Sequence, residues 1–154
     1  MTVSEGAVAE APSRRSNRGF WLVAGSLLLA SVFMLVEIFA NFGMKDTVAH
    51  AEHTLRGVQA AAERIRDADG SLAAADQIRL ATMEPTFSYV AGDDVAHGLD
   101  QVSVATAGSA WAAAVEVRPG ACFYLHLLAD GRVFYGAGTV CTGREALQAT
   151  DPRW

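Results

Sequence analysis

The sequence is poor in the residues that mark many functional classes. Its 154 residues include only two cysteines, and Cys122 and Cys141 are too far apart to form a CxxC redox motif. Basic residues are not in excess, because 12 lysines and arginines stand against 17 aspartates and glutamates, for a net charge of −5. Nothing resembles the basic patch that nucleic-acid binding requires, so no nucleic-acid partner is expected.

Proline and charge are both missing from one long stretch. No proline lies between Phe20 and Ala68, and residues 20–36 carry no charge. The apolar run continues to Phe42, and about 20 helical residues suffice to span a hydrocarbon core. We therefore predict a transmembrane helix over residues 20–43. A cleaved secretory signal is disfavoured, because its apolar stretch would be shorter and no A-x-A-like site closes this one.

Charges on either side of this segment predict its orientation. Arg14, Arg15 and Arg18 precede it, whereas Lys45 and Asp46 follow it. Basic residues stay preferentially on the cytoplasmic side of a membrane. Residues 1–19, which show no periodic pattern, are therefore expected to be a cytoplasmic tail or leader. The rest of a single-pass membrane protein would be extracytoplasmic, at the cell surface.

The two cysteines fall on the predicted outer side. In an oxidising compartment, a pair in a small domain usually forms a disulfide. A bond between Cys122 and Cys141 would close a loop of about 20 residues, a stabilisation of roughly 3 kcal/mol on the chain-entropy estimate. Two free thiols are the alternative.

Residues 44–70 show the spacing of an amphipathic helix that continues the membrane segment. Apolar residues recur at steps of three and four, which places them on one helical face. Such a face cannot remain exposed to water, so it must pack against something. The residues of this stripe are Val48, Ala51, Leu55, Val58, Ala62 and Ile65.

Residues 71–154 are predicted to form an extracytoplasmic α+β domain. Gly70 supplies a helix stop, Ser71 can cap a second helix from Leu72 to Met83, and Pro85 ends it. Turn-like residues separate the apolar runs that follow, including an Asp-Gly pair at Asp130. The predicted strands are Thr86–Ala91, Gln101–Ala107, Ala110–Val117, Ala121–Leu128 and Arg132–Gly136.

Together these elements predict an α+β fold. A long N-terminal helix, transmembrane and then amphipathic, would pack against a small antiparallel sheet. The domain has about 85 residues of its own, a size at which a covering helix and a disulfide add needed stability.

Glu37 is the one ionisable residue within the predicted span. An intramembrane charge is costly, so a functional role is the default hypothesis. Glu37 lies near the outer end, however, where its carboxylate could reach the interface. Two interpretations remain open: an inert interfacial residue, or a residue that pairs with a neighbouring subunit.

Other polar clusters are weaker candidates for a site. His50 and His53 flank Glu52 on the predicted helix, but two histidines at this spacing do not make an HExxH motif, and a solvated face explains them. Asp67 and Asp69 faintly resemble a calcium loop without its distal glutamate, and a helix-ending turn explains them better.

No set of residues indicates catalysis. An enzyme needs a nucleophile or an acid–base set in a cleft, and His97 and His126 have no motif around them. His126 alternates with leucines and is expected on the wet face of the sheet. Cross-strand pairing is the simplest explanation of the aromatic residues, with carbohydrate binding as the alternative. These aromatics are Phe123, Tyr124, Phe134 and Tyr135.

The order of elements resembles that of a type IV pilin. Prepilins carry a short basic leader that ends in glycine, followed by phenylalanine and an apolar helix. Here residues 14–18 precede Gly19 and Phe20. The resemblance implies that a prepilin peptidase cleaves between Gly19 and Phe20.

The C-terminal part is similar to pilin-like proteins of high-GC Gram-positive bacteria. The similarity covers residues 45–154 as an ordered set of short motifs. The matching residues are Met83-Glu84-Pro85, Val102-Ser103-Val104, Trp111, Gly120-Ala121-Cys122-Phe123-Tyr124, Asp130-Gly131, Tyr135-Gly136-Ala137-Gly138, Cys141-Thr142-Gly143 and Trp154.

The chain also departs from the pilin pattern. Family members usually have a glutamate five residues into the mature chain, where it neutralises a neighbouring subunit's N-terminal amine. That position is Ala24 here, the usual Thr-Leu is Trp21-Leu22, and an expected proline near the membrane exit is Asn41. Some minor, tip-located relatives also lack the glutamate.

The expected function is therefore structural. The resemblance implies a minor pilin or pseudopilin subunit whose partners are the membrane, other pilin-like subunits and a prepilin peptidase, with no catalytic residue, cofactor or metal. The alternative is a permanently anchored extracytoplasmic binding module that does not assemble into filaments.

Overall fold

The computed structural model describes residues 45–153, which form a helix packed on a five-stranded sheet. The predicted leader, membrane segment, Gly19–Phe20 cleavage site and Glu37 lie outside these residues. Within them, no helix has the length and apolar character needed to cross a membrane.

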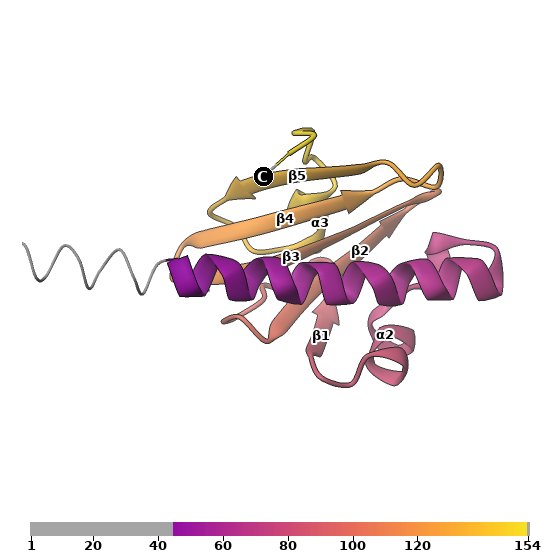
Figure 1. Ribbon diagram of the computed structural model, residues 1–154, viewed down its shortest axis with the longest axis horizontal. Coiled ribbons are helices and arrows are strands. Elements are labelled where there is room, and N and C mark those ends of the chain that lie inside the picture. The colour runs from indigo at the N-terminus through magenta and orange to yellow at the C-terminus, as the bar shows by residue number, and fades with distance from the viewer. Residues whose placement is uncertain (1–44, 154) are drawn as a thin grey trace, which may run out of the picture. The chain divides into compact units, whose positions relative to one another are not determined.

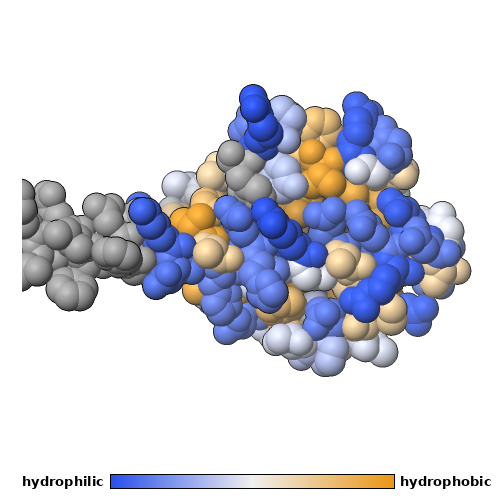
Figure 2. All heavy atoms as spheres, in the orientation of Figure 1, coloured by the Kyte–Doolittle hydropathy of each residue, from blue (hydrophilic) through white to orange (hydrophobic). Residues whose placement is uncertain are grey.

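The first element is a long helix over residues 45–69, named here the long helix, which lies along one face of the sheet (Figure 1). Its apolar stripe is buried as predicted: five of the six stripe residues, from Ala51 to Ile65, are 0% exposed. Only Val48, near the start, is half-buried. The opposite side of the long helix forms a mainly hydrophilic band (Figure 2). The helix ends as predicted at Gly70, whose φ of 74° favours glycine.

Residues 71–84 form two short helices instead of the predicted single one. η1 (Leu72–Ala74) is capped by Ser71, and α2 (Gln77–Met83) starts afresh where the Asp76 side chain accepts a hydrogen bond from the Arg79 N–H. Ala75 lies between them, and its carbonyl oxygen accepts a hydrogen bond from Trp111 Nε1 at 2.9 Å. The break therefore gives the buried indole of Trp111 its partner.

The strands lie in the sheet in chain order, and four of them form the predicted antiparallel meander. Two-residue and Gly-containing turns join them where the sequence predicted turns. Strand bounds agree with the prediction to within two residues at each end. These strands are β1 (Ser88–Ala91), β2 (Gln101–Ala107), β3 (Ala110–Arg118), β4 (Ala121–Leu127) and β5 (Val133–Gly138).

The prediction of a wholly antiparallel sheet was wrong for β1, which pairs with β2 in parallel. Residues 92–100 carry the chain back so that β2 starts beside Ser88. Contacts on two sides hold this connection. Thr54 Oγ1 of the long helix donates to the Leu99 carbonyl at 3.1 Å, and Glu116 of β3 accepts from the Gly98 N–H at 3.0 Å. Such tertiary contacts have no local sequence pattern.

Two cores lie on opposite faces of the sheet. The larger core joins the stripe of the long helix to Trp111, Val115 and Leu125, which alternate along β3 and β4. The smaller one lies under α3 (Gly143–Ala146) and the C-terminal segment. The sheet is thus covered on both faces, which the sequence did not predict.

Truncation of the stripe should destabilise the domain strongly. Leu55→Ala removes a side chain that is 0% exposed, so we expect a loss of about 2–5 kcal/mol in the free energy of unfolding. Leu55→Asp or Val58→Asp should unfold the domain. The measurement is denaturant unfolding of the full chain in detergent, followed by circular dichroism. The control is Ile78→Ala, a side chain that is 73% exposed, and equal stability of the Leu55 and Ile78 variants would contradict helix–sheet packing.

Candidate functional surface

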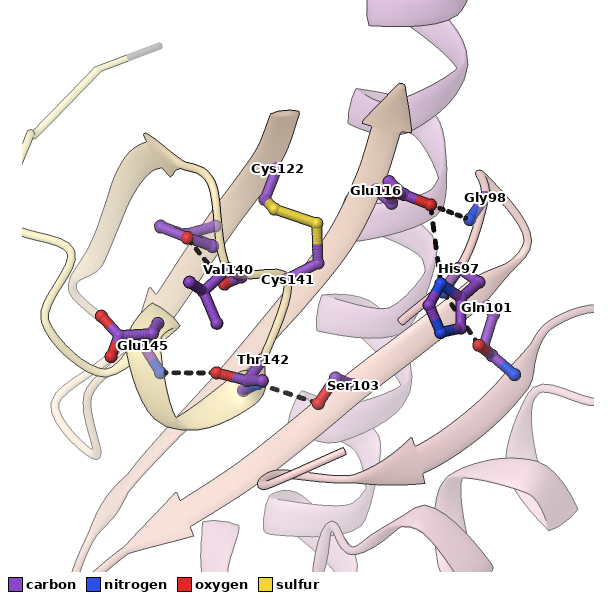
Figure 3. Close-up of a disulfide and its surroundings, with 12 residues drawn as sticks. His97, Gly98, Gln101, Ser103, Glu116, Cys122, Val140, Cys141, Thr142 and Glu145 are labelled. Carbon is purple, nitrogen blue, oxygen red and sulfur yellow. Dashed lines mark hydrogen bonds and ion pairs between the residues drawn. A yellow bond between two sulfur atoms is a disulfide. The ribbon is translucent and has the colours of Figure 1, made fainter. Parts of the chain in front are cut away.

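The predicted disulfide is present and joins Cys122 of β4 to Cys141 (Figure 3). Their Cα atoms are 5.1 Å apart, and both residues are buried in the smaller core. Cys141 belongs to the segment between β5 and α3. The bond therefore fixes the C-terminal segment against the face of the sheet that does not contact the long helix.

α3 is held next to this bond by a cap and a close backbone approach. The Thr142 side chain accepts a hydrogen bond from the Glu145 N–H, and the Gly143 N–H donates to Ser103 Oγ at 2.9 Å. A Cβ atom on Gly143 would lie 2.6 Å from the backbone nitrogen of Ala105, so only glycine allows this approach. The Thr-x-x-Glu spacing is a capping-box pattern, and it is the signal that could have predicted α3.

The C-terminal segment also forms hydrogen bonds with the connection between β1 and β2. The Ala96 N–H donates to the Cys141 carbonyl at 2.8 Å, and the Arg144 N–H donates to the Gly92 carbonyl at 3.0 Å. The Arg144 guanidinium makes a bidentate contact with Asp93 and holds the pKa of that carboxyl below its usual range. The disulfide, α3 and the connection thus form one interlocked layer.

Each of the four histidines lies in a different environment. His50 Nε2 lies 3.0 Å from an Asp100 carboxylate oxygen, while His53 is exposed on the long helix. His97 Nδ1 lies 3.9 Å from Glu116, and His126 Nδ1 lies 3.2 Å from the Ala149 carbonyl oxygen. His126 lies on the face away from the long helix, as expected, but it is only partly exposed there, because the C-terminal segment packs against it.

No metal site is visible in the part of the chain that the structure describes. In residues 45–153, no group of three or more His, Cys, Asp or Glu side chains is placed to hold an ion. Asp67 and Asp69 are ion-paired with Arg66 at 3.0 Å and with Arg79 at 3.3 Å. The interpretation of that segment as a helix-ending turn is confirmed, because the Gly70 N–H bonds to the Arg66 carbonyl at 2.7 Å.

The aromatic residues do not form one platform. Phe123 and Tyr135 pack against the larger core, whereas Tyr124 belongs to the smaller core on the other face. Phe134 lies opposite His126 in the register of β4 and β5, with ring centroids 6.1 Å apart. A flat carbohydrate-binding surface made by all four rings is therefore excluded.

Two grooves border β5, which is one of the two edge strands of the sheet. One has a volume of about 400 Å³ and lies between β5 and the C-terminal segment, with Glu145 and Asp151 in its wall. The other, of about 380 Å³, lies between β5 and the long helix, with Val48 and Phe123 in its wall. Part of the outer edge of β5 is occupied, because Tyr135 and Asp151 exchange backbone hydrogen bonds of 2.7 and 3.1 Å.

No protein-family model matches the chain, and no curated protein and no solved structure matches it.

Loss of the disulfide should weaken the domain measurably. We expect the double variant Cys122→Ala/Cys141→Ala to lose about 3 kcal/mol of unfolding free energy, because a crosslink across 19 residues restricts the unfolded chain. Denaturant unfolding with and without reductant is the measurement, and reductant should leave the double variant unchanged. Equal stability of the oxidised and reduced wild-type protein would contradict a structural role.

Alkaline pH should destabilise the domain through Tyr89. Burial is the main cause that raises the pKa of Tyr89, with the nearby Glu84 carboxylate adding to it. Above pH about 10 the unfolded tyrosine loses its proton while the folded one keeps it, so the unfolding free energy falls as pH rises. Tyr89→Phe should flatten this fall in unfolding experiments between about pH 8 and about pH 11. An unchanged slope would show that Tyr89 is not responsible.

Proposed function

We propose that this chain is a structural pilin-like subunit of the minor pilin or pseudopilin type, in a type IV pilus or a related filament or secretion system. The observation that carries the proposal is the long helix. Its first described residue, Lys45, comes three positions after Phe42, where the apolar segment ends. The apolar face of the long helix is buried against the sheet. A helix of this kind suits a domain that follows a membrane anchor closely in the sequence.

The division of faces on the long helix supports a subunit role. The stripe residues are buried by the sheet, and the outward side carries charged residues such as Arg56 and Arg64, whose side chains are 66% and 54% exposed. The outward side is therefore available to neighbouring subunits. Packing between the membrane segments would tolerate the small residues Gly25, Ser26 and Ala30.

The disulfide supports an extracytoplasmic location for the domain. The disulfide between Cys122 and Cys141 needs an oxidising compartment to persist. The predicted orientation, with the N-terminus cytoplasmic, places both cysteines there. The proposed partners are the membrane and other pilin-like subunits, and Glu37 is the proposed inter-subunit residue.

A second candidate function is a permanently anchored binding module. The grooves beside β5 favour it, since Glu145 and Asp151 offer carboxylates to a polar ligand in a groove of about 400 Å³. This module would retain its leader and would never enter a filament.

The N-terminus of the protein from its native host distinguishes the two functions. Mass spectrometry should find a chain that begins at Phe20, with or without a methyl group on its amine, because a prepilin peptidase removes residues 1–19. The variant Gly19→Val should keep the leader, whereas the matched control Gly6→Val should be processed normally. An intact leader through Arg18 in the wild-type protein would contradict the pilin function and favour the anchored module.

A further inference from the structure

The groove between β5 and the long helix is an opening beside the larger core. It has a volume of about 380 Å³, and its walls come from the first turns of the long helix, from β4 and from β5 (Figure 1). Apolar side chains from all three elements line it: Val48, Phe123 and Ala137. Val48 and Phe123 are only half-buried, and Ala137 is exposed. An apolar group in this groove would therefore remove further apolar surface from water.

The backbone that follows α3 leads into this groove. Tyr135 and Asp151 exchange backbone hydrogen bonds of 2.7 and 3.1 Å, which hold Asp151 against β5. Asp151 and Arg153 both belong to the groove wall, and the ring of Pro152 between them restricts its φ. Trp154 follows Arg153 directly, and consecutive Cα atoms are about 3.8 Å apart. Covalent geometry alone thus keeps the backbone of Trp154 next to the groove.

The chemistry of the groove suits an indole. An aromatic side chain buries about 150–250 Å² when it is covered, so it gains from apolar walls on two sides. The indole N–H also needs an acceptor when it leaves water. The groove supplies both requirements, because the carboxylates of Glu52 and Asp151 line it together with Val48 and Phe123.

We propose that Trp154 places its indole in this groove, against Val48 and Phe123, where its N–H donates to one of the two carboxylates. The segment after α3 then links β5 to the long helix through one side chain. This contact does not depend on the proposed function, because apart from Trp154 all the residues that form it lie among residues 45–153. It also fills one of the two grooves beside β5, so that the groove with Glu145 in its wall is the one left for a ligand.

The direct test is a nuclear Overhauser experiment on the full chain in detergent. The protein is deuterated except for its tryptophan rings and valine methyl groups, and the Trp154 signals are assigned with the variant Trp154→Phe. Cross-peaks should join the Trp154 ring to the methyl groups of Val48. Val95 is the control, because it is 42% exposed and lines neither groove, and it should give no cross-peak to Trp154.

Two results of this experiment would overturn the proposal. One is the absence of cross-peaks between Trp154 and Val48. The other is a cross-peak that persists in a mixed sample, in which half of the chains have protonated tryptophan rings and the other half have protonated valine methyl groups. Such a cross-peak would mean that the indole of a second copy occupies the groove.

A double-mutant cycle tests the same contact without spectra. Trp154→Ala should lower the denaturant concentration at the midpoint of unfolding. In a Val48→Ala background the same change should lower the midpoint by less than half as much, because residues in contact are not additive. In the matched Val95→Ala background the loss should be undiminished. Equal losses in the Val48→Ala and Val95→Ala backgrounds, or no loss on Trp154→Ala alone, would contradict the contact.

Discussion

The structure depends on the burial of one helical stripe by one face of a sheet. Leu55, Val58 and Ile65 are 0% exposed because β3 and β4 cover them, and the sheet in turn gains its larger core from the long helix. A two-sided dependence of this kind is expected in a small domain, since neither an isolated amphipathic helix nor a thin sheet is stable in water. The disulfide belongs to the smaller core on the other face of the sheet and takes no part in this contact.

Much of this arrangement could be predicted because its signals are local. The apolar residues of the stripe recur at helical spacing over residues 48–65. Along the strands, apolar and polar residues alternate, and turns that contain glycine separate one strand from the next. The disulfide followed from two cysteines in a domain expected outside the cytoplasm, and the structure confirms the pairing. The leader and Glu37 lie outside the described residues and stay predictions, as does the proposed pilin-like role.

The features that sequence reasoning missed depend on contacts between distant residues. The parallel pairing of β1 requires the connection 92–100 to be held by Thr54, Glu116 and the segment around Cys141, and none of these contacts is local. The break between η1 and α2 lies at Ala75, whose carbonyl oxygen accepts the hydrogen bond from the distant Trp111 indole. Two missed signals were nevertheless present: Asp76 as a helix cap and the Thr-x-x-Glu pattern that begins at Thr142.

We expect the long helix and the sheet to open as a single cooperative unit, because each buries the apolar face of the other. Native-state hydrogen exchange of the full chain in detergent tests this most directly. The amides of residues 51–66 and those of β3 should open with the same free energy and the same denaturant dependence. Helix amides that open at a free energy lower by about 2 kcal/mol or more, while β3 stays protected, would contradict it.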